Sequence, residues 1–142
     1  MGAPMLNVGI RTLVVALACV VGESMAGGSV VVIGNLNLTS IDPLTLEKVY
    51  TGKVIEVDGI AVTAINANSG SAVRSRFLQT FLNQNEEKYT AYWIVRRYIG
   101  KGAPPRELSG SAAVIDFVRS TPGAIGYVEE TDVQPGVNVL LK

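Results

Sequence analysis

Short apolar runs alternate with longer segments of helical character along most of the chain. The runs are rich in β-branched side chains and are bounded by glycine or polar residues, a pattern typical of buried strands. They are residues 29–34, 61–65, 124–128 and 137–141. The longer segments repeat apolar positions every three or four residues, which predicts helices. They are residues 43–50, 72–82, 86–99 and a last helix that ends near residue 120.

Capping and turn residues sharpen this prediction. Asp42 and Pro43 form a typical helix start, and either Ser109 or Ser111 is expected to cap the last helix. Asp58-Gly59 is expected to be a turn between two extended segments. Strands and helices alternate, so the sequence predicts an α/β fold with a mostly parallel sheet covered by helices.

The N-terminal segment has the features of a secretory signal peptide. An apolar run follows Arg11, and small residues lead up to Ala26. We expect cleavage after Ala26, with a signal peptide over residues 1–26 and a single domain over residues 27–142. The run is too short to span a bilayer. The mature chain is therefore expected to work in the periplasm or as a secreted protein, with no transmembrane span.

Composition excludes several classes of function. The chain has 12 basic and 12 acidic residues, so it lacks the basic excess of a nucleic-acid-binding protein. It has no histidine, and its one cysteine, Cys19, lies in the predicted signal peptide. Disulfides, thiol catalysis, the serine–histidine triad and the common zinc sites are thus excluded from the mature chain. We therefore expect the mature chain to have no enzymatic activity and to bind no cofactor or metal. A lipid anchor on Cys19 is disfavoured, because Ala16 stands three residues before it, where leucine is usual.

Arg74 is unusual because it falls on the apolar side of its helix. On a helical wheel Phe77, Leu78 and Phe81 form one stripe, and Arg74 lies near its centre, whereas Arg76 points to the opposite side. A buried charge needs a partner. Arg74 either reaches a cleft and meets an anion, or it pairs with a carboxylate or extends to solvent at the end of the helix.

The helix over residues 86–99 is apolar on more than one side. One side carries Tyr89, Tyr92, Trp93 and Ile99, and the other carries Ile94 and Tyr98. Such a helix is either packed between elements or covered by a partner. For Trp93, core packing is favoured over stacking on an aromatic ligand.

The loop Asn68-Ser69-Gly70-Ser71 is a candidate anion site because it immediately precedes a helix. The first N–H groups of a helix lack internal partners, and the positive end of the helix dipole favours an anion. The serine hydroxyls add donors, and Arg74 lies one turn away. The alternative is that these residues form an ordinary helix cap.

The sharpest motif in the chain is Thr-Pro-Gly-Ala-Ile-Gly-Tyr-Val at residues 121–128. It is accompanied by the segment 43–53, by Asp58-Gly59, by the run from Arg74 to Phe77, and by Tyr92-Trp93 followed by the loop 100–105. Together these motifs resemble the substrate-binding proteins of ABC-type phosphate importers, in particular a small single-lobe branch of that superfamily. The resemblance covers about residues 30–142.

The resemblance implies a three-layer α/β/α lobe of the type II periplasmic-binding-protein-like fold. In that family two lobes close on the ligand, and helix N-termini with serine and threonine hydroxyls hold the phosphate. The string Ser69-Gly70-Ser71 is similar to the Ser-Gly-Thr cradle of the family. The resemblance therefore implies that Ser69, Gly70, Ser71 and Arg74 are ligands of phosphate or a similar oxyanion.

The chain departs from the family because it shows one lobe only, and because the tryptophan expected before Asp58-Gly59 is missing. A single lobe leaves an anion open to water, so tight binding needs a further component. The candidates are an ABC permease, a second lobe, or a second copy that docks on the helix bearing Tyr92, Trp93 and Tyr98.

Two functions follow from these observations. The first is an exported phosphate-binding or oxyanion-binding domain associated with ABC-type phosphate uptake. The alternative is a structural or interaction protein of the cell envelope, built on a lobe that no longer binds solute.

Overall fold

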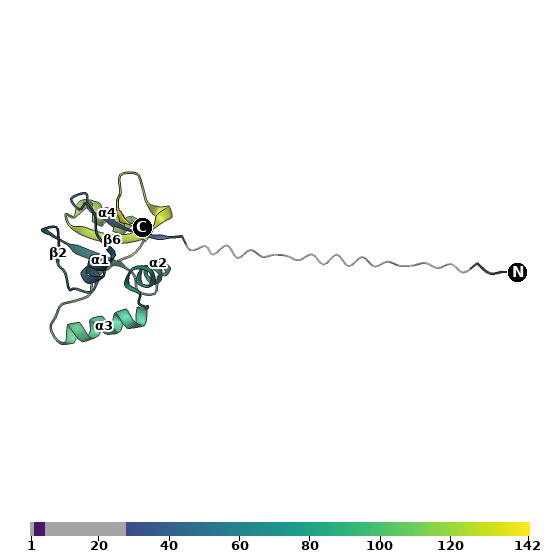
Figure 1. Cartoon of the computed structure of the whole chain (residues 1–142), viewed down its shortest axis with the longest axis horizontal. Coiled ribbons are helices and arrows are strands. Elements are labelled where there is room, and N and C mark those ends of the chain that lie inside the picture. The colour runs from purple at the N-terminus through teal and green to yellow at the C-terminus, as the bar shows by residue number, and fades with distance from the viewer. Residues whose placement is uncertain (1, 5–27) are drawn as a thin grey trace.

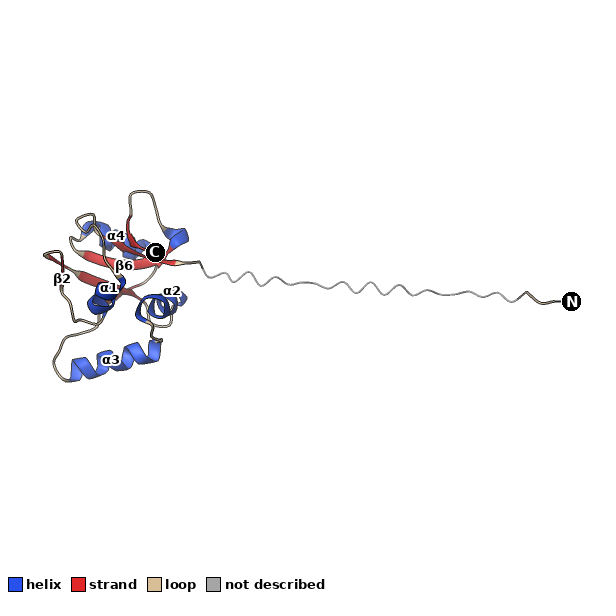
Figure 2. Ribbon diagram, viewed as in Figure 1, coloured by secondary structure: helices blue, strands red, loops and turns tan. Residues whose placement is uncertain are grey.

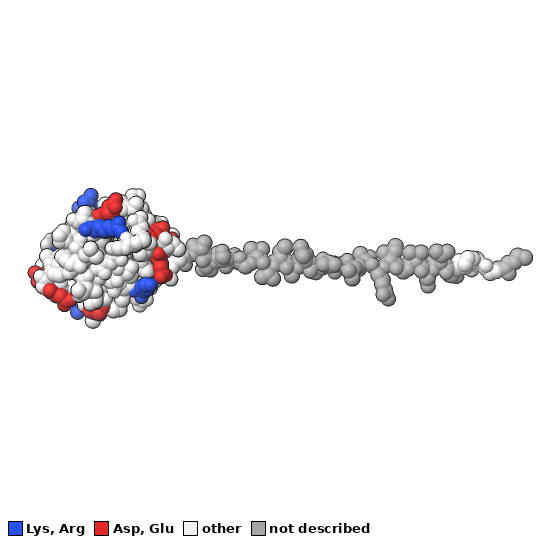
Figure 3. Space-filling model, turned by 90° about the horizontal axis from the view of Figure 1, so that it is seen from above, with Lys and Arg blue, Asp and Glu red and all other residues white. Residues whose placement is uncertain are grey.

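The computed structural model describes residues 2–4 and 28–142, and the strands and helices occupy the domain that begins at Val30 (Figure 1). The predicted signal peptide, its cleavage site at Ala26 and Cys19 lie outside the described residues. Within the part that is described, no helix has the length and apolar character needed to cross a membrane. Basic and acidic side chains are interspersed on the face in Figure 3, in keeping with the balanced charge of the sequence.

A five-stranded sheet forms the centre of the domain (Figure 2). In spatial order its strands are β5 (Arg106–Leu108), β4 (Thr63–Ala67), β6 (Ala124–Glu129), β1 (Val30–Gly34) and β7 (Asn138–Leu141). The pairs β5–β4 and β4–β6 are parallel, and β1 is antiparallel to both β6 and β7. Four of the five strands therefore point the same way, which confirms the mostly parallel sheet.

Helices cover both faces of this sheet and give three layers. On one face lie α1 (Pro43–Tyr50), α2 (Ala72–Phe77), its π-helical continuation Leu78–Leu82, and α3 (Glu86–Tyr98). The other face is covered by α4 (Ser111–Ser120). The residues of β1 alternate between the two hydrophobic clusters, and all five are buried. This two-sided burial explains why β1 reads as an unbroken apolar run.

Local side chains start most of these helices as the sequence predicts. The carboxylate of Asp42 accepts the Thr45 N–H at 2.9 Å and caps α1, and Ser71 is the N-cap of α2. For α4 the prediction of a serine cap is wrong. Its N-cap is Gly110, which has a φ of 85° and no side chain to bond the helix. Glycine is used here because the chain must turn sharply from β5 into α4.

The predicted strand over residues 61–65 is divided between two elements. Ile60–Ala61 forms β3, which pairs with β2 (Glu56–Val57) across the predicted Asp58-Gly59 turn, while β4 begins at Thr63. Both turn residues have positive φ, as a two-residue hairpin requires. The short strand β5 was not predicted, because its three residues, Arg-Glu-Leu, carry no apolar run.

We predict that Gly123→Ala strongly destabilises the fold. Gly123 has a φ of 76°, and a Cβ placed there would lie 2.0 Å from the carbonyl oxygen of Ala61. Backbone strain and overlap should together lower the free energy of unfolding by roughly 3 kcal/mol or more. Gly59→Ala is the matched control, since Gly59 has a similar φ of 79° but open space around it. Its cost should be about 1 kcal/mol. Equal costs in urea unfolding would contradict this explanation.

Candidate functional site

The ends of β4 and β5 bring two helix starts to one edge of the sheet. Because these strands are parallel neighbours, the loops that follow them emerge side by side. The Asn68 amide donates to the Ser109 hydroxyl at 3.0 Å and joins the two loops. One loop leads into α2 and the other into α4, so both helices begin at this edge. The edge beyond the carboxyl ends of parallel strands is where α/β folds commonly bind ligands.

A groove of about 470 Å³ lies between the N-termini of α2 and α4. Its polar lining includes Asn68, Ser71, Ser109, Ser111, Glu129 and Asp132. The first N–H groups of any helix lack intrahelical partners, and no side chain caps α4. The groove thus combines serine hydroxyls with the positive end of the α4 dipole. Such an arrangement is suited to a small anion.

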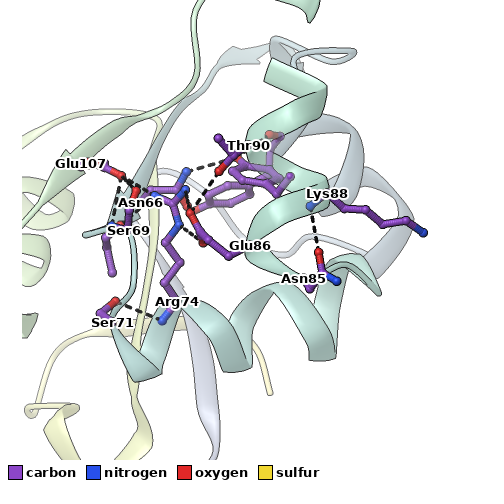
Figure 4. A network of polar contacts seen from close by, with 12 residues as sticks. Asn66, Ser69, Ser71, Arg74, Asn85, Glu86, Lys88, Thr90 and Glu107 are labelled. Carbon is purple, nitrogen blue, oxygen red and sulfur yellow. Dashed lines mark hydrogen bonds and ion pairs between the residues drawn. The ribbon is translucent and has the colours of Figure 1, made fainter. Parts of the chain in front are cut away.

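Arg74 lies on the other side of the Asn68–Gly70 loop and is 5% exposed. Its Nε and Nη2 donate to the two carboxylate oxygens of Glu86, each at 2.8 Å, in the bidentate geometry that suits arginine (Figure 4). Its Nη1 donates to the Ala67 carbonyl at 3.1 Å and to Oε1 of Glu107. The structure therefore shows Arg74 paired with carboxylates, one of the two alternatives that its helical position left open.

Glu107 connects the Arg74 pairs to the predicted anion loop. Its Oε1 accepts the Ser69 hydroxyl at 2.6 Å and the Ser69 N–H at 3.2 Å, in addition to Arg74 (Figure 4). The Ser69 hydrogen bond, aided by the charge of Arg74, lowers the pKa of the Glu107 carboxyl below its usual value. A backbone N–H, a hydroxyl and a guanidinium thus converge on one carboxylate oxygen. These donors form an oxyanion-binding arrangement, and the oxyanion that they hold is the Glu107 carboxylate of the same chain.

The four predicted anion ligands do not share one cavity. Ser69 and Arg74 line a cavity of about 380 Å³ beside α3, whereas Ser71 lines the groove between α2 and α4. The Ser71 hydroxyl also accepts the Arg74 N–H at 3.4 Å as a helix cap. Gly70 has a φ of 81° and no heavy atom within 4 Å of an added Cβ. Whether any of the four binds an anion stays a prediction, and for Ser69 and Arg74 it requires that Glu107 move.

Four further residues contribute to this edge and were not among the predicted anion ligands: Glu86, Glu107, Ser109 and Ser111. Glu107 and Ser109 belong to β5 and the turn after it. Their position follows from the pairing of β5 with β4, for which the sequence carries no apolar signal. Glu86 had a weak signal, because Asn85 is a good helix cap and places Glu86 in the first turn of α3.

Hydrogen bonds from buried tyrosines fix the position of the end of β4. The Tyr127 hydroxyl accepts the Ala67 N–H at 2.9 Å and donates to the Asn66 side chain at 3.0 Å. The Asn66 amide donates to Tyr89, whose hydroxyl donates to the Tyr50 carbonyl at 2.9 Å. Burial raises the pKa of all three tyrosines, so they stay protonated and act as fixed donors. These bonds fix the backbone from which the anion loop departs.

No group of three or more histidine, cysteine, aspartate or glutamate residues is arranged to hold a metal ion in the described part of the chain.

Comparison with known proteins gives a fold but no family. The sequence matches no protein-family model and no curated protein. The structure is similar to an ABC-type phosphate transport receptor from Vibrio cholerae, with a TM-score of 0.56 and 12% identity. It is also similar to a putative phosphate ABC transporter substrate-binding protein with bound phosphate from Clostridium perfringens (TM-score 0.61, 18% identity) and to PstS from Borrelia burgdorferi (TM-score 0.58, 19% identity).

Each of these similarities covers 80% of this chain but only 45%, 44% and 47% of the other chain, in the order given. The chain thus spans less than half the length of these binding proteins. It has the same α/β fold as these proteins, and the predicted resemblance to phosphate ABC transporter substrate-binding proteins is confirmed at the level of fold.

We predict that Arg74 stabilises the fold, although it places a charge on the apolar side of its helix. Arg74→Leu leaves Glu86 and Glu107 without their cation, and should lower the free energy of unfolding by roughly 2 kcal/mol. That is less than for a fully buried pair, because both carboxylates reach solvent. Arg76→Leu is the control. It removes a partly exposed pair with Glu129 and should cost less than about 1 kcal/mol. Urea unfolding of both variants tests this order, and a larger cost for Arg76 would refute it.

The lowered pKa of Glu107 predicts a specific dependence of stability on pH. A carboxyl whose pKa is lower in the folded state stabilises the fold above its ordinary value of 4.5, and this contribution is lost as pH falls through the folded-state pKa. Glu107→Gln should therefore be less stable than wild type at pH 7, and the gap should narrow at pH 3. Chemical unfolding at the two pH values measures the gap. A constant gap would show that the ionised form is not the one stabilised.

Proposed function

We propose that this chain is an exported oxyanion-binding lobe, with phosphate as the first candidate ligand, and that it is associated with ABC-type uptake. The support is the shared fold with proteins described as phosphate receptors, one of which holds bound phosphate. These similar structures are binding proteins, which supports a binding role over an enzymatic one. Export rests on the predicted signal peptide and on the same comparison.

The observation that carries the proposal is the groove between the N-termini of α2 and α4. It presents N–H groups of a helix that no side chain caps, together with the hydroxyls of Ser71, Ser109 and Ser111. These donors are open to a ligand, whereas Ser69 and Arg74 already bind Glu107. We therefore place the oxyanion in the groove, with Ser71 as the predicted ligand that it retains.

Two carboxylates in the groove favour a protonated oxyanion. Glu129 is offset by Arg76, whose Nη2 lies 2.6 Å from its Oε1, while Asp132 has no ion pair among the described residues. A carboxylate accepts a hydrogen bond but cannot donate one. It therefore suits hydrogen phosphate, which carries an O–H group, and repels sulfate, which carries none at neutral pH. Phosphate should bind more tightly than sulfate for this reason.

The groove is open on this lobe, so water competes for its donors and binding by the lobe alone should be weak. A second lobe, or another protein such as the permease, would close the groove and raise the affinity. The phosphate receptors are more than twice as long as the part matched here, so each contains further structure beyond this lobe.

The first test is titration calorimetry of the protein with phosphate, with sulfate as the control. We expect saturable heat with phosphate and at least tenfold weaker binding of sulfate. No heat with either anion from a folded sample would reject the proposal for this chain by itself.

Ser111→Asp locates the site without weakening the fold. An acidic residue in the first turn of α4 stabilises the helix through its dipole, so loss of binding cannot be attributed to unfolding. We expect at least a tenfold loss of phosphate affinity. Ser120→Asp, at the other end of α4, is the matched control and should bind as wild type does. If Ser111→Asp also binds normally, while Glu107→Gln binds more tightly, the anion lies at Ser69 and Arg74 instead.

An envelope structural or interaction role is the second candidate function. It is favoured by the exposed apolar residues of α3, which include Ile94 and Tyr98. A folded sample that binds no anion but self-associates or retains a partner protein would support this role over solute binding.

A further inference from the structure

The cavity of about 380 Å³ beside α3 is separate from the groove between α2 and α4, and the two share no lining residue. Its volume is within the range of roughly 300–1,000 Å³ that is typical of small-molecule sites. The residues of its lining that matter here are Trp93, Ile94 and Arg97 of α3, and Pro104, Pro105 and Glu107 of the segment that leads into β5. An apolar wall with a few polar groups is the usual composition of a ligand pocket.

Trp93 packs α3 on the domain and also lines this cavity. It is 6% exposed and lies against Gly52, in keeping with the predicted core packing. Its neighbour Tyr92 is held as well, since the Tyr92 hydroxyl donates to the Thr51 carbonyl at 2.7 Å. Of the three aromatic residues predicted to form a docking surface, only Tyr98 is therefore available.

The indole N–H of Trp93 is buried and has no hydrogen-bond acceptor among the described residues. Buried donors are normally paired, and an unpaired one is costly. Tyr89, one turn earlier in the same lining, does not satisfy it, because its hydroxyl already bonds the Asn66 amide and the Tyr50 carbonyl. The Trp93 N–H is thus a donor that a ligand in the cavity would satisfy.

The charges around the cavity leave one positive and one negative group without a counterpart. Among the described residues, the charged side chains that line it are Arg74, Arg97 and Glu107. Arg74 is shared between Glu107 and Glu86, so these three together carry one net negative charge (Figure 4). The contacts of Glu107 all involve Oε1, which leaves Oε2 for a donor on a ligand. Arg97 is exposed and has no ion pair in the described part of the chain.

Lys88 and Arg96, the other basic residues of α3, do not line the cavity. A ligand that matches this cavity therefore carries one anionic group for Arg97, one cationic group for Glu107 and an apolar body for the wall. A simple anion would satisfy Arg97 but would be repelled by the excess negative charge at Glu107. A neutral apolar molecule would leave both charges unpaired.

We propose that this cavity binds a free α-amino acid with an apolar side chain. The carboxylate of the amino acid pairs with Arg97 and accepts the Trp93 N–H. Its ammonium group donates to Oε2 of Glu107, and its side chain packs on Ile94, Pro104 and Pro105. Because the lining is separate from the groove assigned to the oxyanion, this site does not depend on the proposed function.

The fluorescence of Trp93 measures binding directly, because Trp93 is the only tryptophan of the chain. We expect L-phenylalanine and L-leucine to change this fluorescence saturably at millimolar or lower concentrations, equally with and without phosphate and equally in Ser111→Asp. No change in fluorescence and no heat of binding with either amino acid, from a folded sample, would overturn the proposal.

Two analogues test the need for both charges. Phenylacetate lacks the ammonium group and phenethylamine lacks the carboxylate, so each should bind at least tenfold more weakly than L-phenylalanine. If phenylacetate binds as tightly as L-phenylalanine, the cavity is an anion site and the amino-acid assignment is wrong.

Arg97→Gln tests the carboxylate partner at an exposed position, where the substitution leaves the packing of α3 intact. It should bind L-phenylalanine at least tenfold more weakly than wild type and phenethylamine equally well, because phenethylamine has no carboxylate. Arg119→Gln, at an exposed position of α4 on the other face of the sheet, is the matched control and should bind both ligands as wild type does. Equal affinity of the two variants for L-phenylalanine would place the ligand elsewhere.

Discussion

The burial of one charge, on Arg74, organises the edge of the sheet on which the rest of this structure depends. A guanidinium that is 5% exposed must have all its donors satisfied. Its partners come from three other elements: the end of β4 through Ala67, the start of α3 through Glu86, and β5 through Glu107. Neutralising this one group therefore ties the start of α3 and the edge strand β5 to the end of β4.

Because Arg74 must be neutralised, the edge of the sheet has two separate regions whose donors could hold an anion. Ser69 and Arg74 form an oxyanion-binding arrangement, but Glu107 supplies the oxyanion from within the chain. The donors that remain open are those of the groove between α2 and α4. A glycine rather than a serine at the N-cap of α4 leaves the first turn of that helix without a side-chain partner. The internal carboxylate and the uncapped helix thus separate a structural anion from the position at which we propose an external one.

Helix α3 packs on the domain through one side and leaves apolar residues exposed on another. Tyr89 and Trp93 bind it to the domain, while Ile94, Val95 and Tyr98 remain outside. The sequence indicated that this helix was apolar on more than one side, and it left open whether neighbours or a partner would cover it. The structure shows that the domain covers one side only.

Much of the fold was determined by the sequence alone. The two-sided burial of β1, the Asp42 cap, the Asp58-Gly59 turn and the similarity to phosphate-binding proteins were all readable, because each depends on adjacent residues or on a continuous motif. Tertiary structure decided the rest. The partners of Arg74 lie 12 and 33 positions away, and the second of them belongs to a three-residue strand with no apolar pattern. The pairing of β5 with β4 alone brings Glu107 to Ser69 and the start of α4 beside α2, since local periodicity contains no information about which strands become neighbours.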